Sequence, residues 1–432
     1  MSREIIELTP PTERAILIGA PRKGRAARQR TAEHLEELER LADTAGATVV
    51  GEVVQQIDRP NSATYIGKGK VEELKDKIAD TDATLLLFDD ELSPSQGKNI
   101  EDMTGKRVMD RAELILDIFA TRARSSEAKM QVELAQLQYM LPRLTRMWAH
   151  LEKFRGGIGV RDPGETQLET DRRLIGHRIK VLGQRLEDVQ RSREVQRGSR
   201  RGEFQASLVG YTNAGKSSIL RALAADDSIF VENRLFATLD PLTREIDLGE
   251  GDRILLTDTV GFVRKLPHQL VASFRATLEE VVEADVLLHV IDVSDPMWED
   301  HRNVVVEVLA ELGAGEKPVT YVFNKSDLLP PEELEAVRER VTNLVPGAVF
   351  VSAAEPDGLE PLKRALTRAV RGSLRVVELR IPVSDGRTLA ELYRDGDVIG
   401  QRLDGDEMVV RARLTPEVAG RVEHRLAGLA AR

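Results

Sequence analysis

Residues 205–217 read QASLVGYTNAGKS, an apolar run that passes directly into a glycine-rich segment. The run is apolar enough for a buried strand. The segment fits the phosphate-loop pattern G-x-x-x-x-G-K-[ST], with Gly210, Gly215, Lys216 and Ser217 at its fixed positions. Such a loop turns its backbone N–H groups toward a chain of phosphates, and the positive end of the following helix adds to the attraction. We expect Lys216 to reach the outer phosphates and the Ser217 hydroxyl to hold Mg²⁺.

The composition indicates a soluble protein of several domains. At 432 residues the chain is too long for one ordinary core, so we expect about three domains. The net charge of −10 argues against a protein that coats nucleic acid indiscriminately. The lack of cysteine excludes thiolate metal sites and favours a cytoplasmic setting. The N-terminus is charged where a signal peptide is apolar, and we find no run of about 18 apolar residues, so we expect no membrane span.

The charge is distributed unevenly along the chain. Residues 122–201 carry a net charge of +8, which leaves −18 for the remainder. A basic segment within an acidic protein indicates an anionic partner, and the alternative is a solvated helix face of mixed charge.

Residues 1–121 alternate between short apolar runs and amphipathic stretches. We predict strands at residues 14–19, 48–55 and 84–89 and helices at residues 25–45 and 70–79. Apolar strands separated by helices favour a parallel sheet with helices packed on it.

Residues 65–70 of this domain read YIGKGK. The two glycines and two lysines can bind a phosphate or an RNA backbone, and ATP binding by the first domain is one alternative. The other is a turn with exposed lysines.

Residues 122–200 carry two apolar seams with alternating spacings of three and four, the pattern of helices that pack along their length. The first seam is Met130, Leu134, Leu137, Leu141, Leu144, Trp148 and Leu151. The second seam is Leu168, Ile175, Ile179, Leu182, Leu186 and Val189. We predict an antiparallel helical hairpin in which each helix buries its seam against the other, with Pro142 breaking the first helix.

The tip of this hairpin reads RGGIGVRDPG over residues 155–164. So many glycines cost backbone entropy that a purely structural turn does not need. A flexible tip flanked by arginines can enter a narrow RNA cavity and contact phosphates. The RNA-contact candidates are Arg155, Gly156, Gly157, Gly159, Arg161 and Gly164. The alternative is a mobile loop without function.

Further motifs follow the phosphate loop in a fixed order. Residues 254–261, ILLTDTVG, bring Asp258 beside the magnesium, directly or through water, and let Gly261 give its N–H to the terminal phosphate. Residues 320–327, TYVFNKSD, end in Asp327, whose carboxylate can accept two N–H bonds from guanine and so selects GTP over ATP. We expect Asn324 to brace the loops and the stem of Lys325 to lie along the base.

The remaining strands of this domain support the same interpretation. Residues 348–353, AVFVSA, end in Ser352 and Ala353, and the Ala353 N–H can reach the guanine carbonyl oxygen. Residues 286–292, VLLHVID, form another buried strand. The four motifs follow predicted strands, at the edge where open α/β sheets bind ligands, so we predict a GTPase domain.

Residues 234–244, RLFATLDPLTR, lie where a switch segment is expected. A threonine here binds Mg²⁺ while the third phosphate is present, and by chemistry both Thr238 and Thr243 qualify. Phe262 follows Gly261 where many relatives of this fold carry a glutamine that orients water. A phenyl ring cannot do this, so we expect slow hydrolysis alone and a partner that completes the site.

The chain ends in a small α+β module without chemistry of its own, which favours an interaction or regulatory role. We predict strands at residues 374–381, 397–403 and 407–414 and helices at residues 385–393 and 415–426. Asp404-Gly405 is typical of a hairpin turn.

These residues resemble the HflX family of translation-associated GTPases over nearly the whole chain. The specific marks are YIGKGK, GGIGVRDPGETQLETDRR, GYTNAGKS, LFATLDP and DTVGF. The resemblance implies binding to the large ribosomal subunit, with the first domain and the hairpin facing the ribosome and the tip placed toward the peptidyl-transferase region. It also implies that Thr238 is the magnesium threonine and that the family lacks the usual glutamine. Ala354 departs from the lysine that many GTPases carry after Ser-Ala.

The site follows from these motifs. We expect catalytic roles for Lys216, Thr238 and Gly261, and Mg²⁺ held by Ser217 and Thr238, with Asp258 acting through water. The expected GTP contacts are Gly210, Tyr211, Thr212, Asn213, Ala214, Gly215, Lys216, Ser217, Ser218, Phe236, Ala237, Thr238, Leu239, Asp240, Asp258, Thr259, Val260, Gly261, Asn324, Lys325, Ser326, Asp327, Ser352, Ala353 and Ala354.

The fold class we predict is α/β, with four domains. Residues 1–121 form a small α/β domain, 122–200 the helical hairpin, 201–371 a P-loop GTPase domain with a parallel sheet, and 372–432 an α+β domain. We expect a monomeric, cytoplasmic GTPase that uses Mg²⁺, binds GTP and GDP, and docks on the large ribosomal subunit and its RNA under nucleotide control, splitting or rescuing stalled or idle ribosomes. The alternative is an RNA-binding or ribosome-assembly factor in which GTP is a structural ligand.

Overall fold

The computed structural model describes residues 12–23, 25–144, 164–197, 203–229, 231–232, 234–267, 270, 279–414 and 416–430. The chain divides into two compact units. The first unit holds Met1–Arg191 together with two later segments, Val231–Asp240 and Val260–Leu278, and the second unit holds the rest. The α/β class predicted from the sequence is confirmed, with parallel sheets in both units.

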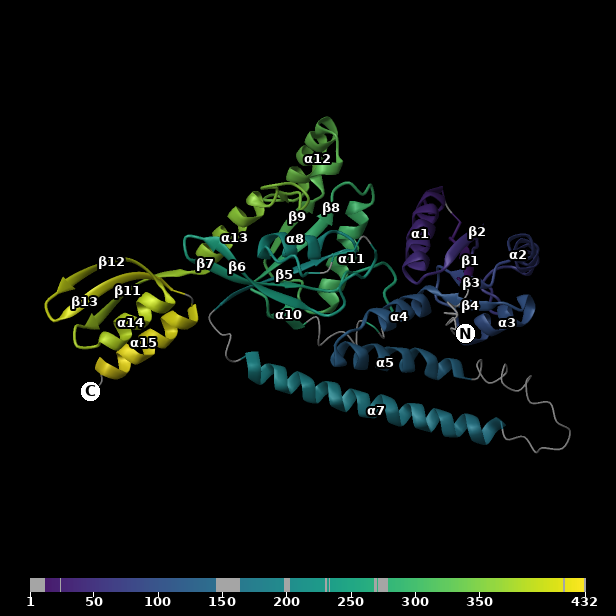
Figure 1. Ribbon diagram of the computed structural model, residues 1–432, viewed down its shortest axis with the longest axis horizontal. Coiled ribbons are helices and arrows are strands. Elements are labelled where there is room, and N and C mark those ends of the chain that lie inside the picture. Colours follow the sequence, from purple (N-terminus) through teal and green to yellow (C-terminus); the bar gives the residue numbers. More distant parts are fainter. Residues whose placement is uncertain are drawn as a thin grey trace, which may run out of the picture. The chain divides into compact units, whose positions relative to one another are not determined.

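The first unit begins with a four-stranded parallel sheet in the order β2-β1-β3-β4. Its elements are β1 (Arg14–Gly19), α1 (Arg25–Thr44), β2 (Thr48–Val54), α2 (Lys68–Thr81), β3 (Leu85–Phe88), α3 (Pro94–Thr104), β4 (Arg107–Asp110) and α4 (Arg111–Arg122). Helices α1 and α4 pack against each other, as do α2 and α3 (Figure 1). The five predicted elements are confirmed, and α3, β4 and α4 are additions to the prediction.

The order of these strands places a topological switch point between β1 and β3. The chain leaves β1 toward β2 and then crosses over to β3 on the other side of β1. Open α/β sheets bind ligands in the crevice that such a reversal leaves at the carboxyl ends of the strands. A cavity of about 560 Å³ lies here, lined by residues that include Gly19, His34, Asp89, Asp90 and Lys265.

The YIGKGK stretch leads into α2. The N–H of Gly67 donates to Oε1 of Gln55 at 2.7 Å, and α2 begins at the next residue. Lys70 forms an ion pair with Glu73 one turn along the helix.

The hairpin of the first unit consists of α5 (Ser126–Met140), the short helix η1 (Leu141–Arg143) and α7 (Gly164–Arg197). Helix α5 ends before Pro142, as predicted. The expected burial of the first seam is confirmed only in part: Leu134 and Leu144 are buried and Met130, Leu137 and Leu141 are half-buried, because α5 turns much of its buried face toward α4, which the prediction lacked. The residues that α5 buries are Ala128, Gln131, Val132, Leu134, Ala135 and Tyr139, of which only Leu134 belongs to the seam.

Helix α7 follows its predicted seam more closely. Leu182 is fully buried, while Leu174, which lies off the seam, is 59% exposed. The two helices of the hairpin are joined by a bidentate pair, in which Arg178 donates to both carboxylate oxygens of Glu133 at 2.7 and 2.8 Å.

The second unit contains a six-stranded sheet in the order β10-β9-β8-β5-β7-β6. Its elements are β5 (Phe204–Gly210), α8 (Lys216–Ala224), β6 (Leu242–Gly249), β7 (Asp252–Asp258), α10 (Glu279–Glu283), β8 (Val286–Asp292), α11 (Trp298–Glu311), β9 (Val319–Asn324), η3 (Ser326–Leu328), α12 (Pro331–Leu344), β10 (Val349–Phe350) and α13 (Glu360–Ser373). All neighbours are parallel except β6, which runs antiparallel to β7. The carboxyl ends of the parallel strands therefore meet at one edge, where the motifs lie.

The C-terminal module of the second unit is a three-stranded antiparallel sheet in the order β11-β13-β12. Its elements are β11 (Arg375–Pro382), α14 (Gly386–Asp395), β12 (Asp397–Asp404), β13 (Glu407–Leu414) and α15 (Pro416–Ala430). Gly405 has a φ of 64° in the turn between β12 and β13, so the predicted hairpin is confirmed. Among the described residues, no helix combines the length and the apolar character needed to cross a membrane.

Candidate nucleotide site

The phosphate loop of the second unit runs from the end of β5 to the start of α8. A Cβ atom at Gly210 would lie 2.3 Å from the carbonyl oxygen of Val290, and one at Gly215 would lie 2.2 Å from Nδ2 of Asn324. Gly215 also has a φ of 96°, in the region that glycine alone adopts without cost. Both positions therefore require glycine.

Lys216 lies folded over this loop. Its ammonium group donates to the carbonyl oxygens of Gly210 at 3.2 Å and of Tyr211 at 3.0 Å. Burial lowers the pKa of Lys216 to about 8, and the nearby Asp258 carboxylate acts in the opposite direction. The loop thus holds a cation whose charged form gains from an added anion.

Ser217 and Asp258 meet beside the lysine. The Ser217 hydroxyl donates to Oδ2 of Asp258 at 2.6 Å, and Asp258 is fully buried at the end of β7. The Thr259 hydroxyl donates to the carbonyl oxygen of Leu208 at 2.6 Å and fixes the turn that follows. A hydroxyl and a carboxylate are hard oxygen ligands of the kind that Mg²⁺ binds together with phosphates, so these residues fit that ion.

Asn324 joins the phosphate loop to the loop after β10. Its Nδ2 donates to the carbonyl oxygen of Ala214 at 3.0 Å, and its Oδ1 accepts the N–H of Ala353 at 3.2 Å. One buried amide thus connects three of the predicted motifs, which is the bracing expected of this residue.

Asp327 lies exposed beside Ser352. Its Oδ1 accepts the Ser352 hydroxyl at 2.6 Å, and that hydroxyl accepts the N–H of Ala354 at 3.2 Å. Lys325 is held by an ion pair to Asp292 at 2.6 Å. The Asp327 carboxylate is therefore oriented by its neighbours while its second oxygen stays available to a base.

The second unit thus brings the phosphate loop, Asp258, the N-K-x-D motif and Ser352-Ala353 to the same edge of its sheet. Tyr211 lies stacked on His301 of α11, with ring centroids 3.9 Å apart. Thr243 lies in β6, where its hydroxyl bonds that of Thr257 at 2.9 Å. Thr238 and Thr243 were both candidates for the magnesium threonine, and Thr243 is engaged by a hydrogen bond within the sheet.

Thr238 and Gly261 belong to the first unit, in its segments Val231–Asp240 and Val260–Leu278. The first of these segments, here called the switch segment, contacts the junction of α4 and α5. Phe236 is buried edge-on against Phe119, with centroids 4.6 Å apart. Oδ2 of Asp240 accepts the N–H groups of Arg124 and Ser125, each at 3.2 Å.

Two further contacts hold the switch segment. Arg122 donates to Glu232 at 2.7 Å. The Ser125 hydroxyl, which caps α5, also donates to Asp240. These partners in α4 and α5 were absent from the predicted site.

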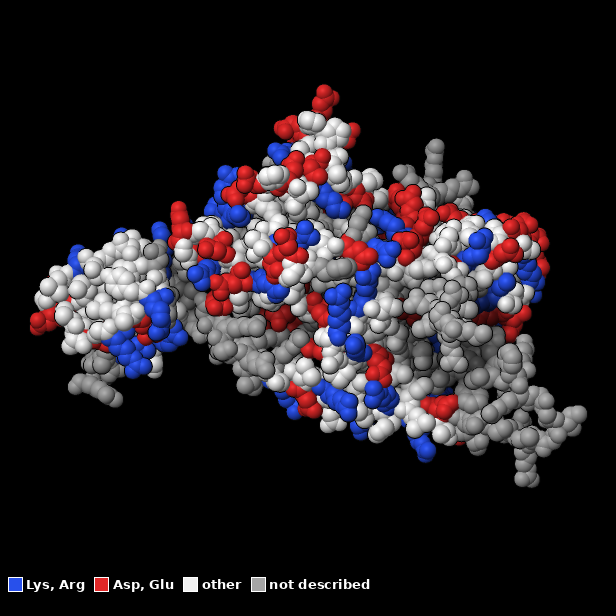
Figure 2. Space-filling model, in the orientation of Figure 1, with Lys and Arg blue, Asp and Glu red and all other residues white. Residues whose placement is uncertain are grey.

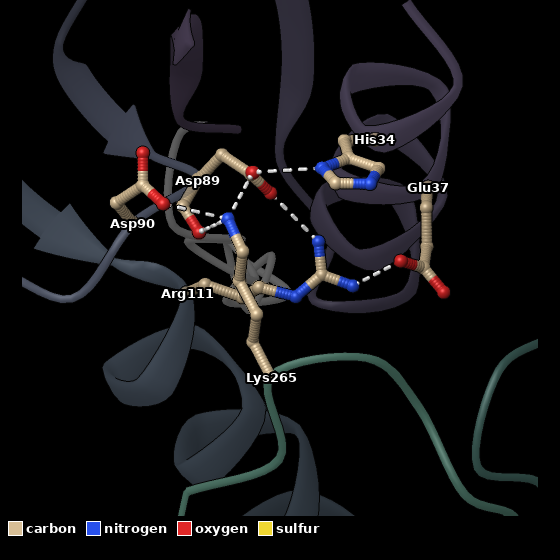
Figure 3. Close-up of polar contacts among 6 residues, drawn as sticks. All are labelled: His34, Glu37, Asp89, Asp90, Arg111 and Lys265. Atoms are coloured by element: carbon tan, nitrogen blue, oxygen red, sulfur yellow. Dashed lines mark hydrogen bonds and ion pairs between the residues drawn. The ribbon is translucent and has the colours of Figure 1, made fainter. Parts of the chain in front are cut away.

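The second segment, here called the Phe262 segment, sends Lys265 to the carboxyl end of β3 (Figure 3). The Lys265 ammonium donates to Oδ2 of Asp89 at 2.6 Å, to Oδ1 of Asp90 at 2.7 Å and to the Asp89 carbonyl oxygen at 3.2 Å. Phe262 itself is buried. Lys265 thereby enters the crevice at the switch point of the N-terminal sheet.

Asp89 is the centre of this network. Arg111 donates to Oδ1 of Asp89 at 2.8 Å and to Glu37 with its other terminal nitrogen, and His34 lies 3.5 Å from Oδ2 of Asp89. Burial would raise the pKa of Asp89, but the His34 hydrogen bond and the charges of Arg111 and Lys265 outweigh it and hold that pKa well below its usual range. One signal for the network was available in the sequence, because the two adjacent aspartates Asp89 and Asp90 lie at the carboxyl end of a predicted parallel strand.

The predicted RNA contacts fall largely outside the described part of the chain. Arg155, Gly156, Gly157, Gly159 and Arg161 lie outside the described residues, and Gly164 begins α7. Their role stays a prediction.

The Asp327 carboxylate suits guanine, and the oxygens of Ser217 and Asp258 suit magnesium. Both lie with the phosphate loop at the carboxyl ends of parallel strands, and together they define a P-loop GTPase. Two curated proteins named GTPase HflX, from Caldanaerobacter subterraneus subsp. tengcongensis and Magnetococcus marinus, are 44% and 45% identical to this chain. Each alignment covers 97% of this chain, with 95% and 96% of the respective relatives. The chain belongs to the HflX family of GTPases.

Models of protein families and a solved structure are also similar to parts of the chain. The matching families are described as GTP-binding GTPase N-terminal over residues 32–120, GTP-binding GTPase Middle Region over residues 122–200 and 50S ribosome-binding GTPase over residues 205–325. A GTP-binding protein from Sulfolobus solfataricus, solved in complex with GDP, is 26% identical, with 83% of this chain and 99% of that chain covered at a TM-score of 0.43.

Proposed function

We propose that this protein is a magnesium-dependent GTPase that docks on the large ribosomal subunit under nucleotide control and splits or rescues stalled or idle ribosomes. The observation that carries the proposal is the position of the two nucleotide-sensing segments. Both the switch segment and the Phe262 segment are bound by the N-terminal domain and the start of the hairpin, within the first unit. The elements that would respond to the third phosphate are therefore packed against the elements that would face the ribosome.

Magnesium fits the residues present. Ser217 and Thr238 would hold it, and Asp258 would act through water. When bound, Mg²⁺ neutralises charge on the phosphate oxygens and so favours phosphoryl transfer.

The protein's own groups do the remaining work. The loop amides and Lys216 place positive charge against the phosphates. The oriented Asp327 carboxylate accepts the guanine N–H groups and rejects adenine, which lacks that donor pair. Gly261 has no side chain to block the approach of its N–H to the terminal phosphate.

Phe262 determines how this enzyme would be regulated. It occupies the position where a glutamine would orient water, and its ring is 1% exposed. We therefore infer slow hydrolysis in the isolated protein and stimulation by the ribosome.

The contacts of these two segments also support nucleotide-controlled docking. With GTP bound, Thr238 and Gly261 would be drawn toward the phosphates, and the helices and sheet that hold their segments would be biased with them. Hydrolysis would remove this bias and favour release. The setting we propose is the cytoplasm, and the state is a monomer.

A second function is supported by Phe262 alone. A site without a water-orienting side chain also suits an RNA-binding or ribosome-assembly factor in which GTP is a structural ligand. The two functions differ in turnover, since a structural ligand predicts binding to ribosomes without stimulated hydrolysis.

Co-sedimentation with ribosomal subunits in GDP, GTP and a non-hydrolysable GTP analogue, with phosphate release measured in parallel, tests the proposal. We expect binding to the large subunit that favours GTP or the analogue, and hydrolysis that rises when ribosomes are added. Equal binding in all three nucleotides would refute nucleotide control.

Deletion of residues 157–162 tests the hairpin tip. The variant should bind GTP and GDP as the parent does but lose most of its effect on ribosome splitting. Splitting at the parent rate would show that the tip is only a turn.

A further inference from the structure

The phosphate loop of the second unit contains a turn with one residue in the left-handed region. The N–H of Ala214 donates to the carbonyl oxygen of Tyr211 at 3.3 Å, which closes a turn over residues 211–214. Inside this turn Asn213 has a φ of 62°, a conformation that costs energy for a residue with a side chain. A contact from outside the turn that favours this shape therefore raises its population.

The Tyr211 carbonyl group joins this turn to Lys216. The oxygen that accepts the Ala214 N–H also accepts the Lys216 ammonium, at 3.0 Å. A rotation of this peptide group would therefore break the hydrogen bond of the turn and displace the ammonium at the same time. The conformation of Tyr211 thus couples the shape of the loop to the cation that we expect to reach the phosphates.

The side chain of Tyr211 is held by His301 of α11. The two rings are stacked, with centroids 3.9 Å apart and planes inclined by 14°, and Tyr211 is only 7% exposed. Paired aromatic rings stabilise each other beyond the area that they bury. The stack therefore connects the start of the phosphate loop to a helix that carries none of the nucleotide motifs.

His301 is itself held by the segment between β8 and α11. Its Nδ1 lies 3.6 Å from Oδ2 of Asp295, whose Oδ1 accepts the N–H of Met297 at 2.8 Å. In the same segment, Oδ2 of Asp292 accepts the Lys325 ammonium of the N-K-x-D motif at 2.6 Å. The segment that positions His301 therefore also supports the guanine side of the site.

The charge of the second unit makes this local geometry important. The chain has a net charge of −10, and Figure 2 shows acidic and basic side chains together over α12 and α13. A surface of mixed sign attracts an anionic ligand only weakly from a distance. The affinity for phosphates therefore depends on how well the loop is shaped before the nucleotide arrives.

We propose that His301 is a positioning residue for the phosphate loop. By holding the Tyr211 ring it keeps the turn of residues 211–214 closed, so that the loop amides and Lys216 are in place for the β-phosphate before the nucleotide binds. The alternative is that the stack only stabilises the fold of the second unit. The inference rests on the nucleotide binding that the proposed function includes, and it adds a residue outside the GTPase motifs.

The size of the effect follows from the population of the closed turn. The free energy of an aromatic stack corresponds to roughly a three- to tenfold change in the equilibrium that it supports. The apparent affinity for the β-phosphate falls in proportion to the fraction of molecules whose turn is closed. GMP lacks the β-phosphate, so its affinity should fall less than that of GDP.

The test is competition of GDP and GMP with a fluorescent GDP analogue for the full-length protein. We expect His301→Leu to lower the ratio of the GDP affinity to the GMP affinity by roughly three- to tenfold. His301→Phe keeps a flat ring and should restore most of this loss. Tyr211→Leu should cause the same loss, and the double variant of Tyr211→Leu with His301→Leu should lose no more, because each change removes the same stack.

Leu309→Ala is the matched control for stability. Leu309 is 3% exposed on α11, about 12 Å beyond His301 along the helix axis. Chemical denaturation should show that Leu309→Ala lowers the free energy of unfolding at least as much as His301→Leu does. Its ratio of GDP to GMP affinity should nevertheless stay at the parent value.

Three results would overturn the proposal: a parent ratio in His301→Leu, no restoration in His301→Phe, or an equal loss in Leu309→Ala. Lys216→Met distinguishes these results from a failure of the proposed function. If the parent binds GDP no more tightly than Lys216→Met does, nucleotide binding at the loop itself is refuted. If the parent binds more tightly, the ratios in the His301 variants decide the role of His301.

Discussion

Replacing Lys265 by alanine should release the Phe262 segment from the N-terminal sheet. Lys265 is 39% exposed and Asp90 26%, whereas Asp89 is only 6% exposed. A hydrogen bond to a charged group contributes about 1.5–3 kcal/mol, and an exposed ion pair about 0–1 kcal/mol. We assign about 1.5 kcal/mol to the Asp89 contact and about 0.5 kcal/mol to the Asp90 contact, so opening of the segment should become easier by about 2 kcal/mol.

That free energy corresponds to about a thirtyfold change in the opening equilibrium. Hydrogen–deuterium exchange of the amides of residues 260–266 measures it directly, in the GDP-bound full-length protein. We expect exchange about thirtyfold faster in Lys265→Ala than in the parent. The Lys23→Ala control removes an ion pair to Asp58 whose partners are 61% and 72% exposed, and it should leave exchange of these amides unchanged.

The pH dependence of this contact is also fixed by the structure. Because the folded pKa of Asp89 lies below its unfolded value, its stabilisation is present above the unfolded pKa of about 4 and is lost as pH falls through the folded pKa. Asp89 therefore keeps its charge between pH 6 and pH 8 and contributes no pH dependence of its own to the effect of Lys265→Ala over that range. Exchange within threefold of the parent across that range would refute the role of Lys265.

Three further predictions concern the second unit. Asp327→Asn should weaken GTP binding by roughly 10- to 100-fold and relax the preference for GTP over ATP, because a charged acceptor of two hydrogen bonds is lost. Competition titrations with GTP and ATP measure this preference. An unchanged preference contradicts the prediction. Because burial lowers the pKa of Lys216 to about 8 and phosphates should raise it, calorimetry at pH 8.5 in buffers of different ionisation enthalpy should show net uptake of up to one proton per GDP, and none in Lys216→Met. Burial, followed by the charges of Arg302 and Lys216, lowers the pKa of His289 to about 3. The unfolded chain therefore binds more protons below pH 6.5, and the free energy of unfolding should fall by about 2 kcal/mol between pH 6.5 and pH 5. Chemical denaturation of His289→Phe should lack that part of the pH dependence, and an unchanged pH dependence contradicts the prediction.

The strands that carry the site were predictable because buried parallel strands are continuous apolar runs. The strand predicted at residues 286–292 is β8 with the same bounds. The edge strand β6 was missed because LTREIDLG alternates polar and apolar residues and lacks such a run. Its antiparallel pairing with β7 follows from a turn that contains Gly249 and Gly251, both at a φ of 87°, a hairpin signal that the prediction did not use.

Long-range contacts set the limit of prediction from the sequence. Lys265 and Asp89 are 176 residues apart, and no periodic pattern connects them. The burial of the first hairpin seam was predicted only in part for a related reason. Spacing identified apolar positions on α5 but not the helix that covers them, and that helix, α4, was absent from the prediction.

The distance along the chain between Lys265 and its partners also has a consequence for protein synthesis. Asp90 is translated 175 residues before Lys265. At about 5–20 residues per second, the ribosome needs roughly 10–35 seconds to add them. During that time the nascent N-terminal domain carries Asp89 and Asp90 without their lysine, and the face of Phe119 without Phe236. A newly made chain therefore completes its first folded unit only after the phosphate loop and Asp258 of the second unit have been synthesised, while most of the second unit is still to come.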